Sequence, residues 1–196
     1  MQNKIILASK SKVRKEILDK NNIESVVEHS NVNEDIVKLS LIKERASPEI
    51  ISKNLAELKA NKVSSKNTDH IVLGADSVID LNGELISKPE NRKEAIEILK
   101  KLNGKTHLLI SSVCISKNGS MIWNYTDKAK LTMKNFSENE LEEYLSKKGI
   151  TFFLNGTVIL QPPIFWFFIL SIKLSISFSS SFIFSYIALI LFCLIQ

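Results

Sequence analysis

Cysteine is too scarce in this sequence to build a disulfide framework. The two present, Cys114 and Cys193, lie in segments of different composition, with no Cys-x-x-Cys or metal-binding spacing around them. This excludes a small secreted fold held by disulfides. The first seven residues hold only a three-residue apolar run, Ile5–Leu7, too short for a signal peptide, so we expect a cytoplasmic protein. The histidines also lack metal-binding spacing, and we expect surface or capping roles for His29, His70 and His107.

Acidic residues are absent from the last 46 residues, Thr151–Gln196, which carry one charged side chain, Lys173. All 21 acidic residues and all but one of the 26 basic residues therefore lie in the first 150, whose net charge is +4. This mild excess does not indicate the clustered basic surface that binds nucleic acid. We expect one domain over residues 1–150, an apolar tail over 151–196, and no binding to nucleic acid.

The tail also lacks a regular apolar period. It contains nine of the ten phenylalanines, in runs of Phe, Ile, Leu and Ser that fit neither a helix nor a strand. Ile164–Ile195 is long enough to span a bilayer, which takes about 20 apolar residues, so a membrane anchor is one interpretation. Pro162-Pro163, the run Ser179–Ser181 and the lack of basic residues after the span speak against it. A shifted reading frame, which would leave the domain incomplete at its C-terminus and the tail foreign to the fold, fits the abrupt change in composition best.

Strand and helix patterns alternate along the first 150 residues. Asn82-Gly83 and Asn118-Gly119 are typical of two-residue hairpin turns, and Ser30–Asp35 is typical of a polar turn. We therefore expect an α/β fold with a mixed twisted sheet flanked by helices. The expected strands cover Lys4–Ala8, Ile23–Val27, Ile71–Leu81, Glu84–Ile86, Thr106–Ser116 and Met121–Met133. The expected helices begin after the caps Ser11 and Ser47, at Pro89 and at Ser137. The helix that begins after Ser47 has an apolar stripe formed by Ile50, Ile51, Leu55, Leu58 and Val63.

The turn after the first strand places hydroxyl and cationic side chains at the start of a helix. Ser9, Lys12 and Arg14 lie there, where unpaired N–H groups and the positive end of the helix dipole favour an anion such as phosphate. The spacing alone favours a plainer alternative, in which Ser11 only caps the helix and the cations face water.

Asp76 lies in the middle of Val72–Ile79, which otherwise has the pattern of a buried strand. Because a buried carboxylate requires a cation or a metal, a functional Asp76 is favoured over a structural aspartate at a strand end. Asp80, by contrast, is expected to serve the adjacent turn. The hairpin brings Lys88 back towards Asp76, where a phosphate and Mg²⁺ would meet, although a solvated loop lysine is the alternative that the sequence alone favours.

Six segments in a fixed order match a known family pattern over about the first 150 residues. Leu7–Leu18 matches Leu-Ala-Ser-x-Ser-Pro-Arg-Arg-x-Glu-Leu-Leu, and Gly74–Ile79 matches Gly-Ala-Asp-Thr-Val-Val. The other matches are Asn31–Glu34 with Asp-Ile-Asp-Glu, Leu55–Ala60 with Leu-Ala-x-x-Lys-Ala, and the segments Asn82–Pro89 and Leu102–His107. With these motifs the chain resembles the Maf family of nucleotide pyrophosphatases.

This resemblance implies a fold of the Maf and inosine triphosphatase type and a hydrolase acting on acid anhydrides. Such an enzyme would use a divalent metal, Mg²⁺ or Mn²⁺, to hydrolyse nucleoside triphosphates, including non-standard ones, to the monophosphate and pyrophosphate. The family is also linked to septum formation and arrest of cell division, and it commonly forms homodimers. Asp76 and Glu34 would hold the metal, Asp76 also activating water. The triphosphate would be bound, and its developing charge neutralised, by Ser9, Lys12, Arg14, Lys59 and Lys88.

Two positions that resemble base-selectivity positions of the family depart from its pattern. Val13 stands where the branch selective for dTTP and UTP has Arg and the methyl-GTP branch has an aromatic residue, and Ser77 replaces a Thr. Asn31 and Asn33 replace acids, which lowers the negative charge around Glu34.

The match stops at about residue 150, so the family's Ala-Gly-x-Tyr-x-Ile-Gln/Glu-Gly segment is missing. The alternatives to an active enzyme are a catalytically impaired, membrane-tethered nucleotide-binding protein and a plain structural α/β domain.

Overall fold

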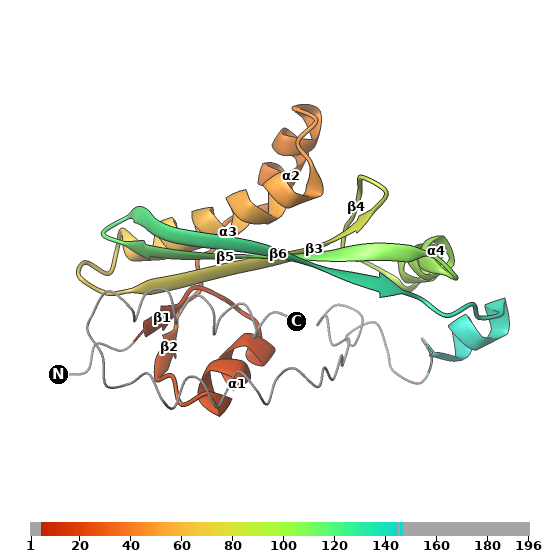
Figure 1. Ribbon diagram of the computed structural model, residues 1–196, viewed down its shortest axis with the longest axis horizontal. Coiled ribbons are helices and arrows are strands. Elements are labelled where there is room, and N and C mark those ends of the chain that lie inside the picture. The colour runs from red at the N-terminus through yellow and green to blue at the C-terminus, as the bar shows by residue number, and fades with distance from the viewer. Residues whose placement is uncertain (1–4, 145, 147–196) are drawn as a thin grey trace.

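The computed structural model describes residues 5–144 and 146, which form a mixed six-stranded sheet flanked by helices (Figure 1). This confirms the expected α/β class. The strand order is β2-β1-β3-β5-β6, with β4 paired to β3. The elements in chain order are β1 (Ile5–Leu7), α1 (Lys12–Lys20), β2 (Ser25–Val27), α2 (Glu34–Lys43), α3 (Pro48–Ser64), β3 (Val72–Leu81), β4 (Glu84–Ile86), α4 (Arg92–Leu102), β5 (Thr106–Lys117) and β6 (Ser120–Thr132).

The predicted hairpin turns are present at both expected places. Asn82 and Gly83 have φ values of 54° and 89°, and Asn118 and Gly119 have φ values of 52° and 79°. Positive φ at both central residues is what a type I′ turn requires, and asparagine and glycine adopt it at the lowest cost. These turns make β3 antiparallel to β4 and β5 antiparallel to β6, whereas β1 runs parallel to both β2 and β3.

Helices cover both faces of the sheet, with α3 along one face and α1 against the other (Figure 1). On the α1 face, Leu18 packs into a cluster with Leu7, Leu73, Val113 and Ile115. On the α3 face, small residues let the helix approach closely, and the cluster there consists of Ala56, Ala60 and Cys114. The central strands β1 and β3 are thereby largely buried on both sides, as in other α/β sheets, whereas Val26 and Val27 of the edge strand β2 are exposed.

Gly74 sets the distance between α3 and the sheet. A Cβ atom at this position would lie 2.3 Å from the carbonyl oxygen of Ala56 and 2.7 Å from the amide nitrogen of Ala60. No side chain fits in that space, so only glycine allows the contact. The Ser52 hydroxyl also donates to the Asp76 carbonyl at 3.2 Å. This close packing brings the polar residues of α3 next to the middle of β3.

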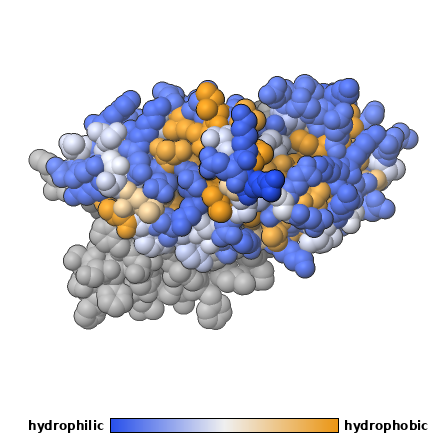
Figure 2. All heavy atoms as spheres, turned by 90° about the horizontal axis from the view of Figure 1, so that it is seen from above, coloured by the Kyte–Doolittle hydropathy of each residue, from blue (hydrophilic) through white to orange (hydrophobic). Residues whose placement is uncertain are grey.

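The helix α2 was missed by the sequence analysis, which expected a polar turn at Ser30–Asp35 and no helix after it. None of its residues is buried, and its large apolar side chains Ile36, Leu39 and Ile42 are 65%, 59% and 48% exposed. It lies on the side of the molecule seen in Figure 2, where apolar side chains interrupt a mostly hydrophilic surface. A helix that buries nothing has no apolar stripe pointing to a core, although its Asn33 cap and acidic first turn were signals in the sequence.

Two further expectations need correction. Ile50 and Leu58 belong to the predicted apolar stripe of α3 but are 48% and 41% exposed, whereas the other three members are buried. The helix expected from Pro89 begins at Arg92, because the Asn91 side chain accepts the backbone N–H of Glu94 and caps it there.

The C-terminal part of the sequence lies largely outside the described residues. The predicted capping box of the last helix is present, since the Ser137 N–H donates to Glu140 Oε2 at 2.8 Å and the Glu140 N–H to Ser137 Oγ at 3.4 Å. The end of that helix, the tail over 151–196 and Cys193 are not described. Within the described part of the chain, no helix combines the length and apolar character needed to cross a bilayer.

Candidate active site

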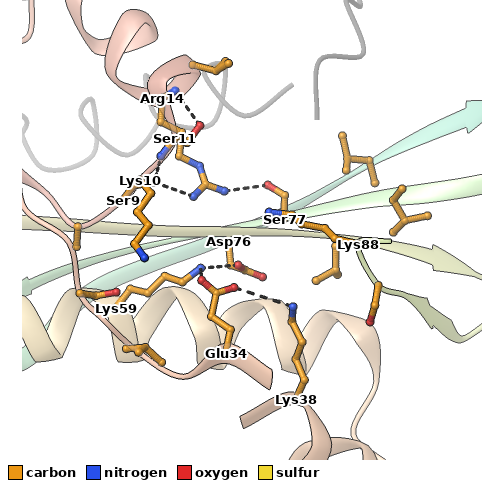
Figure 3. A pocket seen from close by; sticks show the side chains of 18 of the residues that line it. Ser9, Lys10, Ser11, Arg14, Glu34, Lys38, Lys59, Asp76, Ser77 and Lys88 are labelled. Atoms are coloured by element: carbon orange, nitrogen blue, oxygen red, sulfur yellow. Dashed lines mark hydrogen bonds and ion pairs between the residues drawn. The ribbon is translucent and has the colours of Figure 1, made fainter. Parts of the chain in front are cut away.

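A gap along one edge of β3 forms the floor of the candidate site. On this edge β1 pairs with β3 only at Val72 and Leu73, and β4 pairs with it only from Ile79 onward. The five residues between them, Gly74–Val78, have no neighbouring strand on this side within the described chain. A cavity of about 430 Å³ occupies the gap, between α1 on one side of the sheet and α2 and α3 on the other (Figure 3).

Arg14 enters this cavity from the first turn of α1. Its Nη1 donates to the Ala75 carbonyl at 2.8 Å and to Ser9 Oγ at 3.2 Å, and its Nη2 donates to Ser77 Oγ at 3.4 Å (Figure 3). Burial lowers the pKa of Arg14, while the nearby carboxylates of Asp76 and Glu34 oppose this effect. Because a guanidinium stays protonated in proteins, the cavity contains a fixed, planar cation.

Ser9 lies in the turn that connects β1 to α1. Its Oγ accepts the N–H of Ser11 at 3.1 Å as well as the Arg14 guanidinium. Ser11 in turn caps α1 by accepting the Arg14 N–H at 3.4 Å. The Ser9 oxygen accepts both hydrogen bonds, so its own hydrogen is left to donate to an anion in the cavity.

Lys59 joins two carboxylates from different elements. Its Nζ lies 2.7 Å from Asp76 Oδ1 on β3 and 2.9 Å from Glu34 Oε1 on α2 (Figure 3). Lys59 and Asp76 are each only 6% exposed. A lysine and an aspartate this deeply buried require charge partners, and each supplies one to the other. The sequence alone offered no sign of this pairing, because the two residues are on separate elements.

Glu34 begins α2 and is held ionised by its neighbours. Burial would raise the pKa of Glu34, but Lys59, Lys38 and Lys88 outweigh it and lower the pKa. Lys38 lies one turn further along the helix, with its Nζ 4.0 Å from Glu34 Oε2. Burial also lowers the pKa of Lys88, and the attraction of Glu34 and Asp76 only partly compensates.

The donor atoms fit a hard divalent cation, although the expected metal stays a prediction. Asp76 Oδ2 is buried and makes no hydrogen bond to any described residue, and Glu34 supplies a second carboxylate nearby. The described residues contain no group of three or more His, Cys, Asp or Glu side chains arranged to hold a metal. A pair of carboxylates is the usual protein share of a Mg²⁺ site that takes its other ligands from water and substrate phosphates.

The structure brings most of the residues predicted from the sequence to this one cavity. Those that line it are Ser9, Val13, Arg14, Glu34, Lys59, Asp76, Ser77 and Lys88. Lys12 does not: it is the first residue of α1 and is exposed outside the cavity. None of the three histidines lines the cavity, and Asp80 accepts the Gly83 N–H, as expected of a turn residue.

Two cations that the sequence analysis did not select also line the cavity, Lys10 and Lys38. Lys10 points into it from the turn between β1 and α1 (Figure 3). Its position between two hydroxyl residues was a signal in the sequence, whereas Lys38 depended on a helix that the analysis missed. The lining also includes apolar side chains, among them Ile17, Ile79 and Leu109. The site therefore offers both cations for a strongly anionic group and apolar surface for an apolar group.

Comparisons with known proteins find similar chains. A family model described as "Maf-like protein" matches residues 4–176. A nucleoside triphosphate pyrophosphatase of Pelagibacter ubique (strain HTCC1062) is 71% identical over 147 residues, which cover 75% of each chain. A 7-methyl-GTP pyrophosphatase of Brucella abortus biovar 1 (strain 9-941) is 34% identical over 149 residues, which cover 76% of this chain and 75% of the relative. A solved HAM1 protein from Coxiella burnetii aligns with a TM-score of 0.37 and 14% identity, covering 65% of this chain and 70% of that one.

Proposed function

Because this chain belongs to the family of Maf-like proteins, we propose that it hydrolyses nucleoside triphosphates to the monophosphate and pyrophosphate. The observation that carries this proposal is the cavity itself, in which five cations surround two carboxylates next to an apolar pocket. The cations are Lys10, Arg14, Lys38, Lys59 and Lys88. The proposal is supported by the two relatives, which are named nucleoside triphosphate pyrophosphatase and 7-methyl-GTP pyrophosphatase.

The cations that line the cavity suit the triphosphate. Arg14 presents a planar guanidinium already fixed by Ala75 and Ser77, so that little side-chain freedom is lost when an anion binds. Ser9 has a hydrogen left to donate, and Lys10 and Lys88 add further positive charge. Together these groups neutralise the charge that develops on the phosphates during the reaction.

The proposed reaction is an attack of water on the α-phosphorus. A bond forms between the water oxygen and this phosphorus, the bond from phosphorus to the α–β bridging oxygen breaks, and pyrophosphate leaves with that oxygen. Asp76 Oδ2 accepts the proton of the water, since it is the carboxylate oxygen without a partner among the described residues. Lys59 holds Asp76 ionised and in place through the contact at 2.7 Å.

A divalent cation completes the proposed site. Held by Asp76 and Glu34, it would polarise the phosphate oxygens and lower the pKa of a bound water. Glu34 is suited to this because its pKa is lowered by the surrounding lysines in spite of its burial. Metal dependence is tested by removing divalent cations with EDTA, which should abolish turnover, and restoring Mg²⁺ or Mn²⁺.

The base of the nucleotide is proposed to lie against the apolar lining of the cavity. Val13 and Ser77 also line the cavity and are the selectivity positions suggested by the family resemblance. Val13 offers neither the charge of Arg nor an aromatic face, so the chain matches neither selective branch. The relatives carry both general and methyl-GTP names, and we expect activity on more than one base.

The experiment is a screen of standard and methylated nucleoside triphosphates, with pyrophosphate release as the measurement. Asp76→Asn should lower turnover by about 10²–10⁴-fold, the usual contribution of a positioned acid or base. Asp80→Asn is the matched control, because it makes the same change at a turn residue on the same strand and should leave turnover unchanged. Release of orthophosphate alone, or equal rates in the two variants, would contradict the proposal.

Other properties of the family are proposed here on the resemblance alone. They are a homodimer, a cytoplasmic location and a link to septum formation, which a delay of cell division on overproduction would test. The boundary at residue 150 and the foreign origin of the tail likewise stay predictions, and the family match extends beyond that boundary to residue 176. Finding the family's missing segment in another reading frame downstream of Ile150 would support them.

A further inference from the structure

A buried serine on β5, Ser111, lies outside the lining of the cavity, and the proposed reaction gives its hydroxyl no role. Ser111 is 8% exposed, and the neighbouring residues on the same face of the strand, Leu109 and Val113, are apolar. A serine between apolar neighbours loses hydration when buried, and the strand would gain from an apolar residue there. Burial of this hydroxyl is therefore favourable only where a hydrogen bond compensates for the lost hydration.

The partner of Ser111 is Ser77, directly across the sheet. The two residues are paired in register between β3 and β5, and their Oγ atoms lie 3.1 Å apart. Ser77 Oγ also accepts the Arg14 Nη2–H at 3.4 Å. While Ser77 Oγ accepts from Arg14, it keeps its hydrogen and a second lone pair, and either of these can serve the hydrogen bond with Ser111. The result is a chain of contacts from β5 through β3 to the cavity.

The orientation of Ser77 matters because its side chain has three staggered rotamers, and the contact with Arg14 is made in the one that the structure shows. The Ala75 carbonyl and Ser9 hold Nη1 of the guanidinium at 2.8 Å and 3.2 Å and set its plane. Ser77 adds the contact that holds Nη2. The hydrogen bond to Ser111 keeps Ser77 in the rotamer that makes this third contact.

We propose that Ser111 is a positioning residue, which holds the Arg14 guanidinium in its phosphate-binding orientation by fixing the rotamer of Ser77. This inference rests on the proposed function, since Arg14 matters only where the cavity binds a phosphorylated ligand. Ser111 itself does not line the cavity. Its effect passes through Ser77, so the two serines should act as one unit.

A double-mutant cycle tests this unit. Ser111→Ala should raise KM for the best triphosphate substrate by about three- to tenfold, the effect of losing one hydrogen bond near a charged group, with kcat changed less than twofold. Ser77→Ala should do the same, and the variant carrying both changes should be no worse than either alone. Ser111→Thr keeps the hydroxyl and should restore KM to within twofold of wild type.

The matched control is Ser116→Ala on the same strand. Ser116 is fully buried, and its replacement by alanine removes a hydrogen bond of 2.7 Å to Asn61 Oδ1. It lies five residues from Ser111 along the strand and does not line the cavity. A merely structural role for Ser111 would make the two variants alike, with unchanged KM in both. Where Ser111→Ala fails to fold, Ser111→Cys keeps a side chain of similar size, but its thiol is only a weak donor and acceptor, so it should show the same rise in KM.

Binding of inorganic tripolyphosphate by calorimetry separates this inference from the proposed function. Ser111→Ala should weaken this binding by the same factor as it raises KM, and Ser116→Ala should not. If no nucleoside triphosphate is hydrolysed by the wild-type chain, the proposed function fails while the titration still tests Ser111. Equal tripolyphosphate affinity in Ser111→Ala and wild type, or effects of Ser77→Ala and Ser111→Ala that multiply in the double variant, would overturn the inference.

Discussion

Replacing Lys59 by methionine should destabilise the protein far more than any other single change among its charged neighbours. Methionine keeps the length of the side chain and removes only the ammonium group. Asp76 would then be left 6% exposed with neither oxygen paired, because Oδ1 loses its contact at 2.7 Å and Oδ2 already has none among the described residues. Removing one partner from a buried ion pair costs about 3–5 kcal/mol.

Substitutions of the two carboxylates, Asp76 and Glu34, should cost less stability than Lys59→Met, and their costs should differ from each other. Asp76→Asn keeps an oxygen that accepts from Lys59, and Lys59 retains Glu34, so the cost should be about 1–3 kcal/mol, that of one hydrogen bond to a charged group. The Glu34 side chain is 38% exposed and remains hydrated. Glu34→Gln should therefore cost less than about 1 kcal/mol, as for other exposed pairs.

Urea unfolding of the full chain, followed by circular dichroism in EDTA, measures this order of free energies. EDTA is needed because a bound metal would add its own stabilisation. Lys38→Met is the control for loss of a lysine, since its pair with Glu34 is wide at 4.0 Å and should contribute less than about 0.5 kcal/mol. The double variant Lys59→Met/Asp76→Leu should be more stable than Lys59→Met alone, because the unpaired charge is gone. The reasoning is refuted if Lys59→Met costs less than Asp76→Asn, or if the double variant is the least stable of the series.

Three further predictions follow from single positions. Gly74→Ala should cost about 3 kcal/mol or more and lower the melting temperature, because its Cβ would lie 2.3 Å from a backbone oxygen; an unchanged melting temperature would contradict the packing of α3. Burial raises the pKa of Cys114 to about 11, so the folded protein keeps a proton that the unfolded chain loses, and the stability of wild type relative to Cys114→Ala should fall as the pH rises from about 9 to 11. Urea unfolding at pH 8 and 10.5 measures this difference, and a constant difference would exclude it. Lys10→Met should raise KM about two- to fivefold at low salt and less at high salt, whereas Lys12→Met should not change it.

Local signals in the sequence were enough for much of the fold. The Asn-Gly pairs fixed both hairpins because a two-residue turn depends on the φ angles of its own residues. Asp76 was identified from its charge within an apolar strand, which the ion pair with Lys59 explains. The helix α2 was missed because it buries no residue, so that no tertiary contact leaves a periodic trace in its sequence.

The remaining features depended on contacts between distant segments. Lys59 was selected only through the family resemblance, because its partner is brought to it by the crossover from α3 to β3. Lys12 was selected and Lys10 was not, because which of these side chains faces the cavity depends on how the turn and α1 pack beside β3, and the sequence does not show that packing. The relay from Ser111 to Arg14 runs across three elements, and no local pattern marks it.

The gap beside β3 also has a consequence for the order of folding. β3, β5 and β6 are antiparallel neighbours, with α3 preceding them directly in the chain, whereas the pairing of Ile6 with Val72 spans 66 residues. Contacts of short sequence separation form early, and those that close long loops form late. A partly folded chain with β3, β5, β6 and α3 in place would already pair Lys59 with Asp76 but would lack Ser9 and Arg14, which arrive with β1 and α1. A ligand that binds the completed cavity therefore adds its binding energy to the docking of the N-terminal strand, and acts as a clamp on the last step of folding.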